Sequence, residues 1–260
     1  MDIVGNGFLA RSLRPLAGRH PDVVALAAGV SWASGTSEAD FAREATLLRD
    51  TAKQCLADGR RLLFFSTAAT GMYGLAEGPG REDVPVTPCT AYGAHKLGLE
   101  ELLRDSGADH LILRLGHLVG PGQPDHQLLP SLVRQLREGE VRVHRGAARD
   151  LIDVRDVVAV IDRLLGLGLR SGTVNVASGC AMPVTEIVDR LRAGLGLRAA
   201  YRFQEAGGQH VISIEKLRAL VPYVESLSFG PGYHRRILAD FTRTVVPGRE
   251  AAADVTKGVL

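Results

Sequence analysis

Cysteines and metal-binding patterns are scarce in this sequence of 260 residues. The three cysteines, Cys55, Cys89 and Cys180, are odd in number and widely spaced, which suits reduced thiols better than a disulfide framework or a zinc site. The eight histidines show no H-x-x-x-H or comparable ligand spacing, so we expect no bound metal. A G-x-S-x-G turn is missing as well, which argues against a serine hydrolase.

The sequence also lacks a long hydrophobic run and a block of like charge. Its longest apolar run near the start, residues 23–30, is far shorter than a membrane span, and residues 1–5 lack the basic segment of a signal peptide. The net charge of +2 is spread thinly along the chain. We therefore expect no membrane partner, no nucleic-acid partner and a cytoplasmic location, while a small anionic ligand stays compatible with the charge.

What the sequence does contain begins with a glycine-rich turn. Residues 2–4 are expected to form a short strand that leads into GNGFLA, residues 5–10, and then into a helix with leucines on one face. In this G-x-G-x-x-A pattern Gly5 permits a tight turn, Gly7 lets the backbone approach a pyrophosphate, and Ala10 allows close packing. Glycine turns before helices are common, so an ordinary turn is the alternative; the position in the chain favours a dinucleotide site.

A second pattern joins a strand end to a Tyr-Lys pair. The apolar run 60–66 ends at Ser66 and Thr67, and further along Tyr92 and Lys96 stand four residues apart, on one face of an expected helix. An ammonium beside a phenol favours the phenolate. Lowering a tyrosine pKa from near 10 to near 7 takes about 3 units, or about 4 kcal/mol, which the lysine and a cationic nicotinamide can share. Chance occurrence of this spacing, with a packed tyrosine and a solvated lysine, is the alternative.

Together these segments resemble the extended short-chain dehydrogenase/reductases, the NAD-dependent epimerase/dehydratase family that acts on nucleotide sugars. The resemblance covers most of the chain. The matching segments are GNGFLA, FFSTAATGMYG, YGAHK, LILRLGHLVGPGQ and RDLIDVRDV. His117 replaces the usual asparagine of the fourth segment, and Asp153 replaces a histidine of the fifth. The resemblance implies an α/β fold: a Rossmann-like, doubly wound parallel sheet with a small C-terminal substrate-binding lobe.

The resemblance also implies roles for individual residues. Tyr92 acts as the acid or base, Lys96 holds the ribose, and Thr67 or Ser66 orients the substrate oxygen. The implied cofactor-binding residues are Gly5, Asn6, Gly7, Phe8, Leu9, Arg11, Ala27, Ala28, Gly29, Lys96 and Gly116. The implied substrate-binding residues are His117, Gln127 and Arg149, of which the arginine contacts the diphosphate.

The segment PDVVALAAG, residues 21–29, is similar to the fourth strand of the family's sheet. On this alignment the second and third strands are missing. A competing alignment makes residues 22–28 the second strand. Both alignments lack the acidic residue that binds the adenosine ribose, so we expect NADP(H) slightly more than NAD(H), with Arg11 or Arg14 near a 2′-phosphate; solvated surface arginines are the alternative.

We expect a dinucleotide-binding domain of residues 1–122 with part of 150–178, and a substrate-binding lobe of 123–149 and 179–260, with a loosely ordered end from residue 248. The expected reaction is reduction of a keto group, presumed at the 4-position, on a nucleotide-activated deoxysugar. Ala68 and Ala69 stand where dehydratases of this family carry Asp-Glu, which disfavours dehydration. Nucleotide-sugar epimerisation and binding without catalysis are the alternatives. Relatives suggest a homodimer through the Tyr-Lys helix and residues 37–57.

Overall fold

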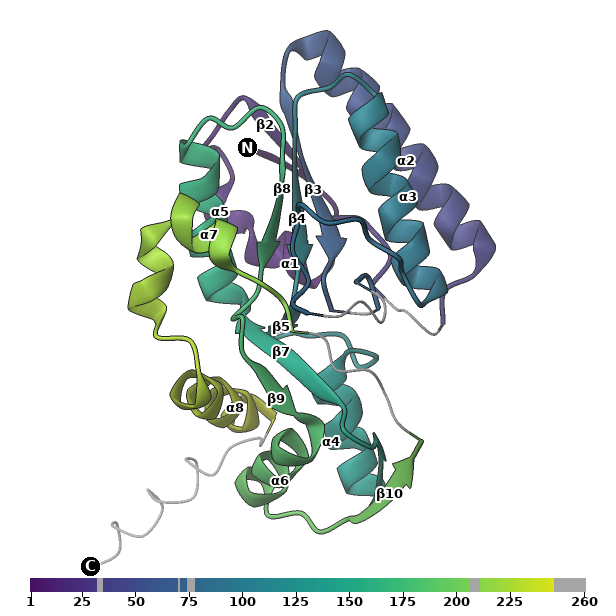
Figure 1. The fold of residues 1–260 in the computed structure, drawn as a ribbon, viewed down its shortest axis with the longest axis vertical. Helices are drawn as coiled ribbons and strands as arrows, with labels where there is room; N and C mark the ends of the chain where they lie inside the picture. The colour runs from purple at the N-terminus through teal and green to yellow at the C-terminus, as the bar shows by residue number, and fades with distance from the viewer. Residues whose placement is uncertain (32–34, 70, 74–77, 206–210, 246–260) are drawn as a thin grey trace, which may run out of the picture.

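A parallel sheet of five strands forms the centre of the computed structural model, which describes residues 1–31, 35–69, 71–73, 78–205 and 211–245. The strands lie in the order β1 (Asp2–Val4), β2 (Val23–Leu26), β3 (Arg61–Thr67), β4 (His110–Leu115) and β8 (Thr173–Val176) (Figure 1). Every residue of β2, β3 and β4 is buried. Continuous apolar strands of this kind are typical of a parallel sheet covered on both faces.

Helices cover both faces of this sheet. One face packs against α2 (Glu38–Asp58) and α3 (Ala91–Asp105), which lie side by side (Figure 1). The other face packs against α1 (Phe8–Ser12), α5 (Val154–Gly166), α7 (Glu215–Leu220) and the 3-10 helix η2 (Pro222–Leu227). The predicted Rossmann-like α/β fold is therefore confirmed.

The strand order decides between the two alignments of residues 21–29. In the usual doubly wound sheet the strands lie in the order 3-2-1-4-5-6. The second and fourth strands therefore flank the first, and only the fourth lies between the first and the fifth. Here β2 pairs on one side with β1, through Asp2 and Val24, and on the other with β3, through Val24 and Leu62. The segment is thus the fourth strand of the usual order, and the competing alignment is wrong. Residues 5–22 contain only α1 and η1 (Arg14–Leu16), so β1 lies at the edge of the sheet.

The first helix is shorter than its leucine pattern predicted. It ends at Ser12, and the chain continues as η1 around Pro15. Proline has no N–H to continue the α-helix but is tolerated in the first turn of a new helical segment. Leu13 and Leu16 are nevertheless buried, so the periodic leucines still reach the core.

The helix α2 begins with a capping box at Ser37. The Ser37 side chain accepts a hydrogen bond from the backbone of Asp40, whose carboxylate accepts one from the backbone of Ser37. This capping box satisfies two N–H groups at the helix start. The helix ends at Gly59, which adopts φ 64°, a conformation that favours glycine.

A second, smaller core lies beyond the carboxyl ends of the strands, in the lower half of Figure 1. Its helices are α4 (Leu128–Glu138), α6 (Val184–Leu195) and α8 (Pro231–Val245). Its strands are β5 (His117–Val119), β6 (Glu140–His144), β7 (Ala148–Asp153), β9 (Ala181–Pro183) and β10 (Ala200–Gln204). The predicted lobe included all of 179–260, whereas Ile212, Leu217 and Val224 pack into the core beside the sheet.

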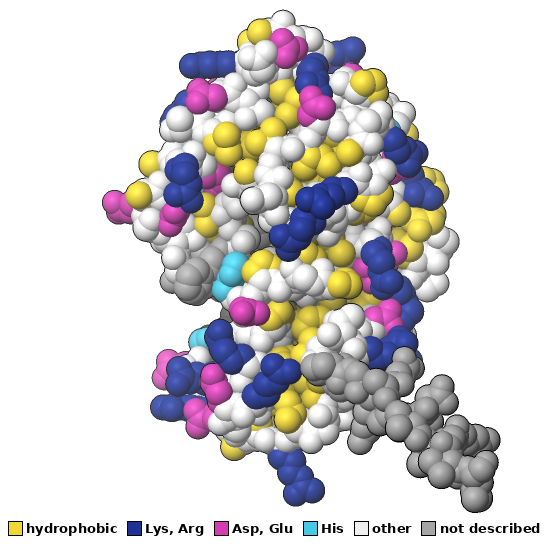
Figure 2. All heavy atoms as spheres, turned by 180° about the vertical axis from the view of Figure 1, so that it is seen from behind, with side chains coloured by type: hydrophobic (Ala, Val, Ile, Leu, Met, Phe, Trp, Pro, Cys, Tyr) yellow, Lys and Arg dark blue, Asp and Glu magenta, His cyan; other side chains and the backbone are white. Residues whose placement is uncertain are grey.

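The surface carries both signs of charge. On the face opposite to the view of Figure 1, basic and acidic side chains are interspersed (Figure 2). None of the described helices combines the length and apolar character needed to cross a membrane. The predicted loose end, residues 248–260, lies outside the described residues.

Candidate active site

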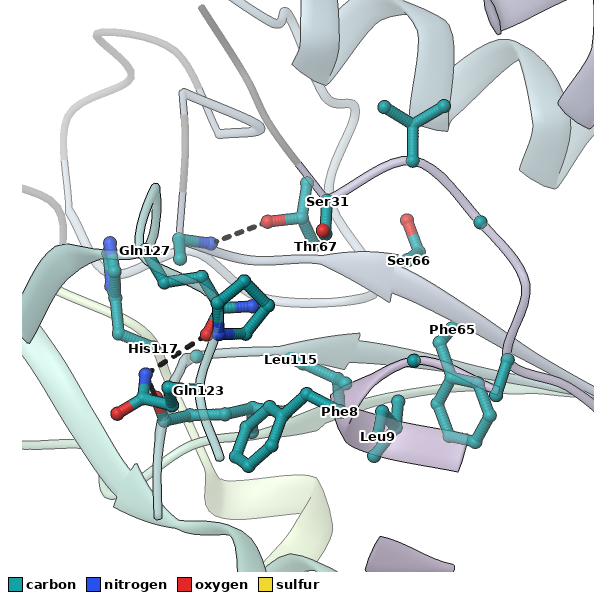
Figure 3. A pocket seen from close by; sticks show the side chains of 18 of the residues that line it. Phe8, Leu9, Ser31, Phe65, Ser66, Thr67, Leu115, His117, Gln123 and Gln127 are labelled. Carbon is teal, nitrogen blue, oxygen red and sulfur yellow. Dashed lines mark hydrogen bonds between the residues drawn. The ribbon is translucent and has the colours of Figure 1, made fainter. Parts of the chain in front are cut away.

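A cavity of about 440 Å³ lies at the carboxyl ends of the strands, beside α4 and β7 (Figure 3). Ligands of open α/β sheets bind at this edge, where loops from several strands converge. Most of the predicted site residues line it. They are Gly7, Phe8, Leu9, Ala27, Gly29, Ser66, Thr67, Tyr92, Lys96, Gly116, His117, Gln127 and Arg149.

Four predicted cofactor residues, Gly5, Asn6, Arg11 and Ala28, are not among the lining residues. Gly5 has a structural reason to be glycine: its φ is 130°, and a Cβ there would lie 2.5 Å from the carbonyl oxygen of Ala27. The Arg11 guanidinium donates to the backbone oxygen of Asn6 at 2.9 Å and to that of Gly122 at 3.2 Å. It therefore joins the glycine turn to the loop after β5. Arg14 is exposed in η1.

Tyr92 and Lys96 enter the cavity from the first turns of α3. The helix begins at Thr90, whose side chain accepts a hydrogen bond from the backbone of Gly93 at 3.0 Å. The Tyr92 hydroxyl donates to the carbonyl oxygen of Val30 at 3.1 Å. The Lys96 ammonium lies 5.7 Å from the centre of the Tyr92 ring. The structure thus brings the predicted pair together on one face of the helix.

The Lys96 side chain is buried, with 2% of the residue exposed. It donates to Glu44 Oε1 at 2.6 Å and to the carbonyl oxygen of Phe65 at 3.3 Å. Burial works against the ammonium, but the charges of Tyr92 and Glu44 prevail and hold the pKa of Lys96 above its ordinary value. Lys96 is accordingly a fixed cation at the base of the cavity.

The predicted lowering of the Tyr92 pKa counts a cationic nicotinamide beside Lys96 and stays a prediction; the protein groups alone act in the opposite direction. Burial raises the pKa of the phenol above its ordinary value; Lys96 opposes the rise, and Glu44 adds to it.

Glu44 is the functional candidate that sequence reasoning missed. It is 3% exposed, and its second oxygen lies 2.9 Å from His95 Nε2. Although burial opposes ionisation, the hydrogen bond from His95 and the charge of Lys96 keep the pKa of Glu44 below its ordinary value. One signal was available: Glu44 shares the helix face of the buried Leu48 and Ala52, at the four-residue spacing.

The two hydroxyls at the end of β3 have different environments. Ser66 donates to the buried carboxylate of Glu100 at 2.6 Å, and this carboxylate also accepts two hydrogen bonds from Arg114, at 2.9 and 2.8 Å. Thr67 accepts a hydrogen bond from the backbone of Ala69 at 3.1 Å. The Ser66 hydroxyl is thus donated to Glu100, and both Ser66 and Thr67 line the cavity as candidates for orienting a substrate oxygen.

The predicted substrate residues lie on the opposite side of the cavity. Burial, together with the charge of Arg149, lowers the pKa of His117 to about 3, so its imidazole is neutral. Its Nδ1 is buried without a hydrogen-bond partner in the part of the chain that the structure describes. Gln127 precedes α4 and accepts a hydrogen bond from Gln123 at 3.0 Å.

Arg149 combines partial burial with an unpaired charge. Its Nη1 donates to the carbonyl oxygen of Ala148 at 2.8 Å, and within the described ranges it forms no salt bridge. Burial lowers its pKa from an ordinary value of 12.5, which leaves the guanidinium charged at neutral pH. An unpaired guanidinium in a cavity is suited to a ligand carboxylate or phosphate. Among the residues that the structure describes, no cluster of three or more His, Cys, Asp or Glu side chains is arranged to hold a metal ion.

Comparison with known proteins gives matches to both sequence and fold. The profile of the NAD dependent epimerase/dehydratase family matches residues 10–177. A dTDP-6-deoxy-L-talose 4-dehydrogenase (NAD(P)(+)) of Kitasatospora kifunensis is 29% identical over 210 residues, 72% of this chain and 63% of that protein. A UDP-glucose 4-epimerase of Azospirillum brasilense is 46% identical over 72 residues, 25% of this chain and 20% of that protein. The chain thus spans less than two thirds of either relative.

The fold is shared with solved structures. The structure of RMD from Pseudomonas aeruginosa complexed with NADPH superimposes with a TM-score of 0.73 at 21% identity. The match covers 93% of this chain and 98% of that one. The architecture of this chain is therefore that of a known fold.

Proposed function

This chain belongs to the NAD dependent epimerase/dehydratase family, and from that premise we propose that it modifies a nucleotide-activated sugar with a nicotinamide cofactor. The specific reaction that we propose is reduction of a keto group on a deoxysugar intermediate, at its 4-position. The observation that carries the proposal is the juxtaposition in one cavity of a Tyr-Lys pair and an unpaired arginine, Arg149.

The residues of the cavity fit a nicotinamide dinucleotide. At Gly7 a Cβ would have no heavy atom within 4 Å, so the backbone is open to a ligand at the turn after β1. Two of the three N–H groups of Lys96 donate to Glu44 and to the carbonyl oxygen of Phe65. The third is available to a ribose hydroxyl. When bound there, a reduced nicotinamide supplies the hydride.

The protein side of the reaction is proton transfer and orientation. In the proposed reduction the Tyr92 hydroxyl, which holds its proton at neutral pH, gives that proton to the forming alkoxide. Lys96 then stabilises the phenolate left behind. Thr67 holds the same substrate oxygen against Tyr92. A raised phenol pKa suits a general acid, because the proton is present when it is needed.

The other side of the cavity suits the nucleotide diphosphate. Arg149 offers a charged guanidinium, and the neutral His117 lines the same cavity. Gln127, at the start of α4, lies at the same rim. In this proposal Arg149 and Gln127 bind the nucleotide end of the substrate, while Tyr92 contacts the oxygen on the reacting carbon. Binding at both ends orients that carbon for hydride transfer.

The edge position of β1 bears on cofactor use. Without a second strand there is no acidic residue to hold both hydroxyls of the adenosine ribose, and we propose a preference for NADPH, with the exposed Arg11 beside the glycine turn. A loosely held adenosine end also favours release of the cofactor after each turnover. That behaviour is compatible with a reductase.

An epimerase is the second candidate, favoured by the 46% identity to a UDP-glucose 4-epimerase over 72 residues. An epimerase needs to retain its cofactor through an oxidation and a reduction. Cofactor that stays with the protein through purification would favour this candidate. Binding without catalysis is a third.

The proposed homodimer, through α2 and α3, is compatible with all three candidate functions. Leu56 on α2, with 54% of its surface exposed, is an apolar side chain on that surface.

The Tyr92→Phe variant tests the assignment. It removes the proposed proton donor and retains the ring, so we expect turnover of NADPH with keto-sugar nucleotides to fall by about 10²- to 10⁴-fold, the usual contribution of a general acid. The control is Tyr223→Phe, since Tyr223 lies beside Arg163 and does not line the cavity. Full turnover by Tyr92→Phe would contradict the proposal.

A further inference from the structure

Glu44 lies between the proposed catalytic helix and its neighbour, where no sequence motif marks a functional residue. Its two carboxylate oxygens contact different partners: Oε1 lies 2.6 Å from Lys96 Nζ, and Oε2 lies 2.9 Å from His95 Nε2. His95 in turn stacks on Phe41, with ring centres 4.2 Å apart. The carboxylate is thus held at both oxygens and has little freedom to move.

The Lys96 ammonium is oriented by this carboxylate. Of its three N–H groups, one donates to Glu44 and a longer one, at 3.3 Å, donates to the carbonyl oxygen of Phe65. Within the described ranges the third has no protein acceptor, and Lys96 lines the cavity. Two fixed acceptors determine where the third N–H points.

We propose that Glu44 is a positioning residue, which fixes the Lys96 ammonium so that its remaining N–H faces the cofactor ribose, and which tempers the charge that Lys96 presents to Tyr92. This inference rests on the proposed function, because it takes Lys96 as the ribose-binding residue. Glu44 itself acts through Lys96 and does not need to touch the cofactor or the substrate.

Gly29 makes room for this arrangement. A Cβ at Gly29 would lie 2.3 Å from Glu44 Oε1 and 3.1 Å from Lys96 Nζ, closer than a side chain tolerates. The φ of Gly29 lies outside the left-handed region, so alanine is compatible with its backbone. The expected role of this glycine was contact with the cofactor; its missing side chain also admits the Glu44–Lys96 pair.

The charges around the pair give the proposal a measurable consequence. The phenol of Tyr92 faces the positive Lys96 and the negative Glu44, and Lys96 faces both of these and, further off, Glu100. Removing the negative charge of Glu44 removes one cause of the raised pKa of Tyr92. A charge within about 4–6 Å of a titrating group shifts its pKa by about 1 unit or more.

Two variants of Glu44 separate position from charge. Glu44→Gln retains an oxygen acceptor for Lys96 but loses the charge, whereas Glu44→Ala loses both. We expect the pKa of Tyr92 to fall by about 1 unit in both. We expect the Kd of NADPH to rise by about tenfold in Glu44→Ala and to stay within about threefold of the wild type in Glu44→Gln.

The phenol is measured by ultraviolet difference titration, with the same variants in a Tyr92→Phe background subtracted to remove the other four of the five tyrosines. This titration needs neither cofactor nor substrate, so it reports on Glu44 even where the proposed function fails. NADPH affinity is measured by titration calorimetry. If Glu44→Ala does not fold, Gly29→Ala displaces the carboxylate instead, with Gly98→Ala on α3, where a Cβ meets nothing within 4 Å, as its control.

Each result bears on the proposal. The proposal is supported if the pKa of Tyr92 falls in Glu44→Gln while that variant retains its affinity for NADPH. It also requires that this affinity is lost in Glu44→Ala, or in Gly29→Ala. A Tyr92 pKa unchanged in Glu44→Gln would overturn the electrostatic part. Wild-type NADPH affinity in Glu44→Ala, or in Gly29→Ala where the first does not fold, would overturn the positioning part. Absence of NADPH binding to the wild type would overturn the proposed function and the positioning part with it, whereas a Tyr92 pKa that falls in Glu44→Gln would still support the electrostatic part.

Discussion

Replacement of Arg149 by alanine should weaken substrate binding with little effect on folding. Among the described residues its guanidinium donates to the backbone oxygen of Ala148 and forms no ion pair, so the change strands no buried carboxylate. An arginine offers five N–H donors, and one is used here. A hydrogen bond to a charged group contributes about 1.5–3 kcal/mol. Loss of one such bond to the diphosphate corresponds to about a 10- to 150-fold loss of affinity.

The assay compares KM, kcat and direct binding. A diphosphate is held equally in the ground state and the transition state, so KM should rise while kcat stays nearly unchanged. The Kd of the nucleoside diphosphate alone, measured by calorimetry, should rise by the same factor. Arg145→Ala is the matched control, because Arg145 lies over the ring of Phe203 and does not line the cavity. Equal KM and Kd in Arg149→Ala and the wild type would refute the assignment of Arg149.

Two further predictions concern stability. Glu100→Gln leaves the buried Arg114 without its carboxylate and should lower the free energy of unfolding by about 3–5 kcal/mol in urea denaturation. The exposed neighbour Glu101→Gln should change it little, and equal stability of the two variants would contradict this account. Burial raises the pKa of Asp150 from 3.8 to about 6, against the hydrogen bonds from Ser178. A raised folded pKa means that stability is fully present below pH 3.8 and is lost as the pH rises through about 6, by about 3 kcal/mol for a shift of this size. The difference in unfolding free energy between Asp150→Asn and the wild type should therefore change across this pH range, and a constant difference would count against it.

Local sequence patterns were sufficient for the parts of the site that lie within one element or turn. The Tyr92–Lys96 spacing depends only on the helix repeat, and the glycine turn depends only on backbone freedom at Gly5 and Gly7. The buried runs 23–26 and 61–67 could be recognised as strands from the sequence, because a parallel strand that helices cover on both faces is mostly apolar along its length. These features need no knowledge of distant residues.

The remaining features depend on contacts between distant segments. Glu44 and Lys96 are 52 residues apart in the chain, and nothing local to either marks them as partners. Likewise, the commitment of the Ser66 hydroxyl to Glu100 depends on how α3 packs on β3. The environment of the Tyr92 phenol also depends on distant segments, since its burial and the carboxylate of Glu44 both raise its pKa and neither follows from the helix spacing.

The strand order of the sheet could not be predicted from the sequence alone. The segment matches the family's fourth strand, but an assignment of residues 22–28 to the second strand stayed open, because both strands are short and apolar. Only the pairing of β2 with both β1 and β3 distinguishes them. The sequence did, however, limit the choice to these two, and it located the missing segment between the first helix and Pro21.

The most direct test of the central claim is the fate of the transferred hydride. The protein is incubated with a keto-sugar nucleotide and NADPH that carries deuterium at the transferable position, and the sugar product is examined by mass spectrometry. The account predicts one deuterium on the former keto carbon and one oxidised cofactor for each product formed, with loss of both in Tyr92→Phe. An isomerised sugar without deuterium and without consumption of cofactor, or no product at all, would contradict it.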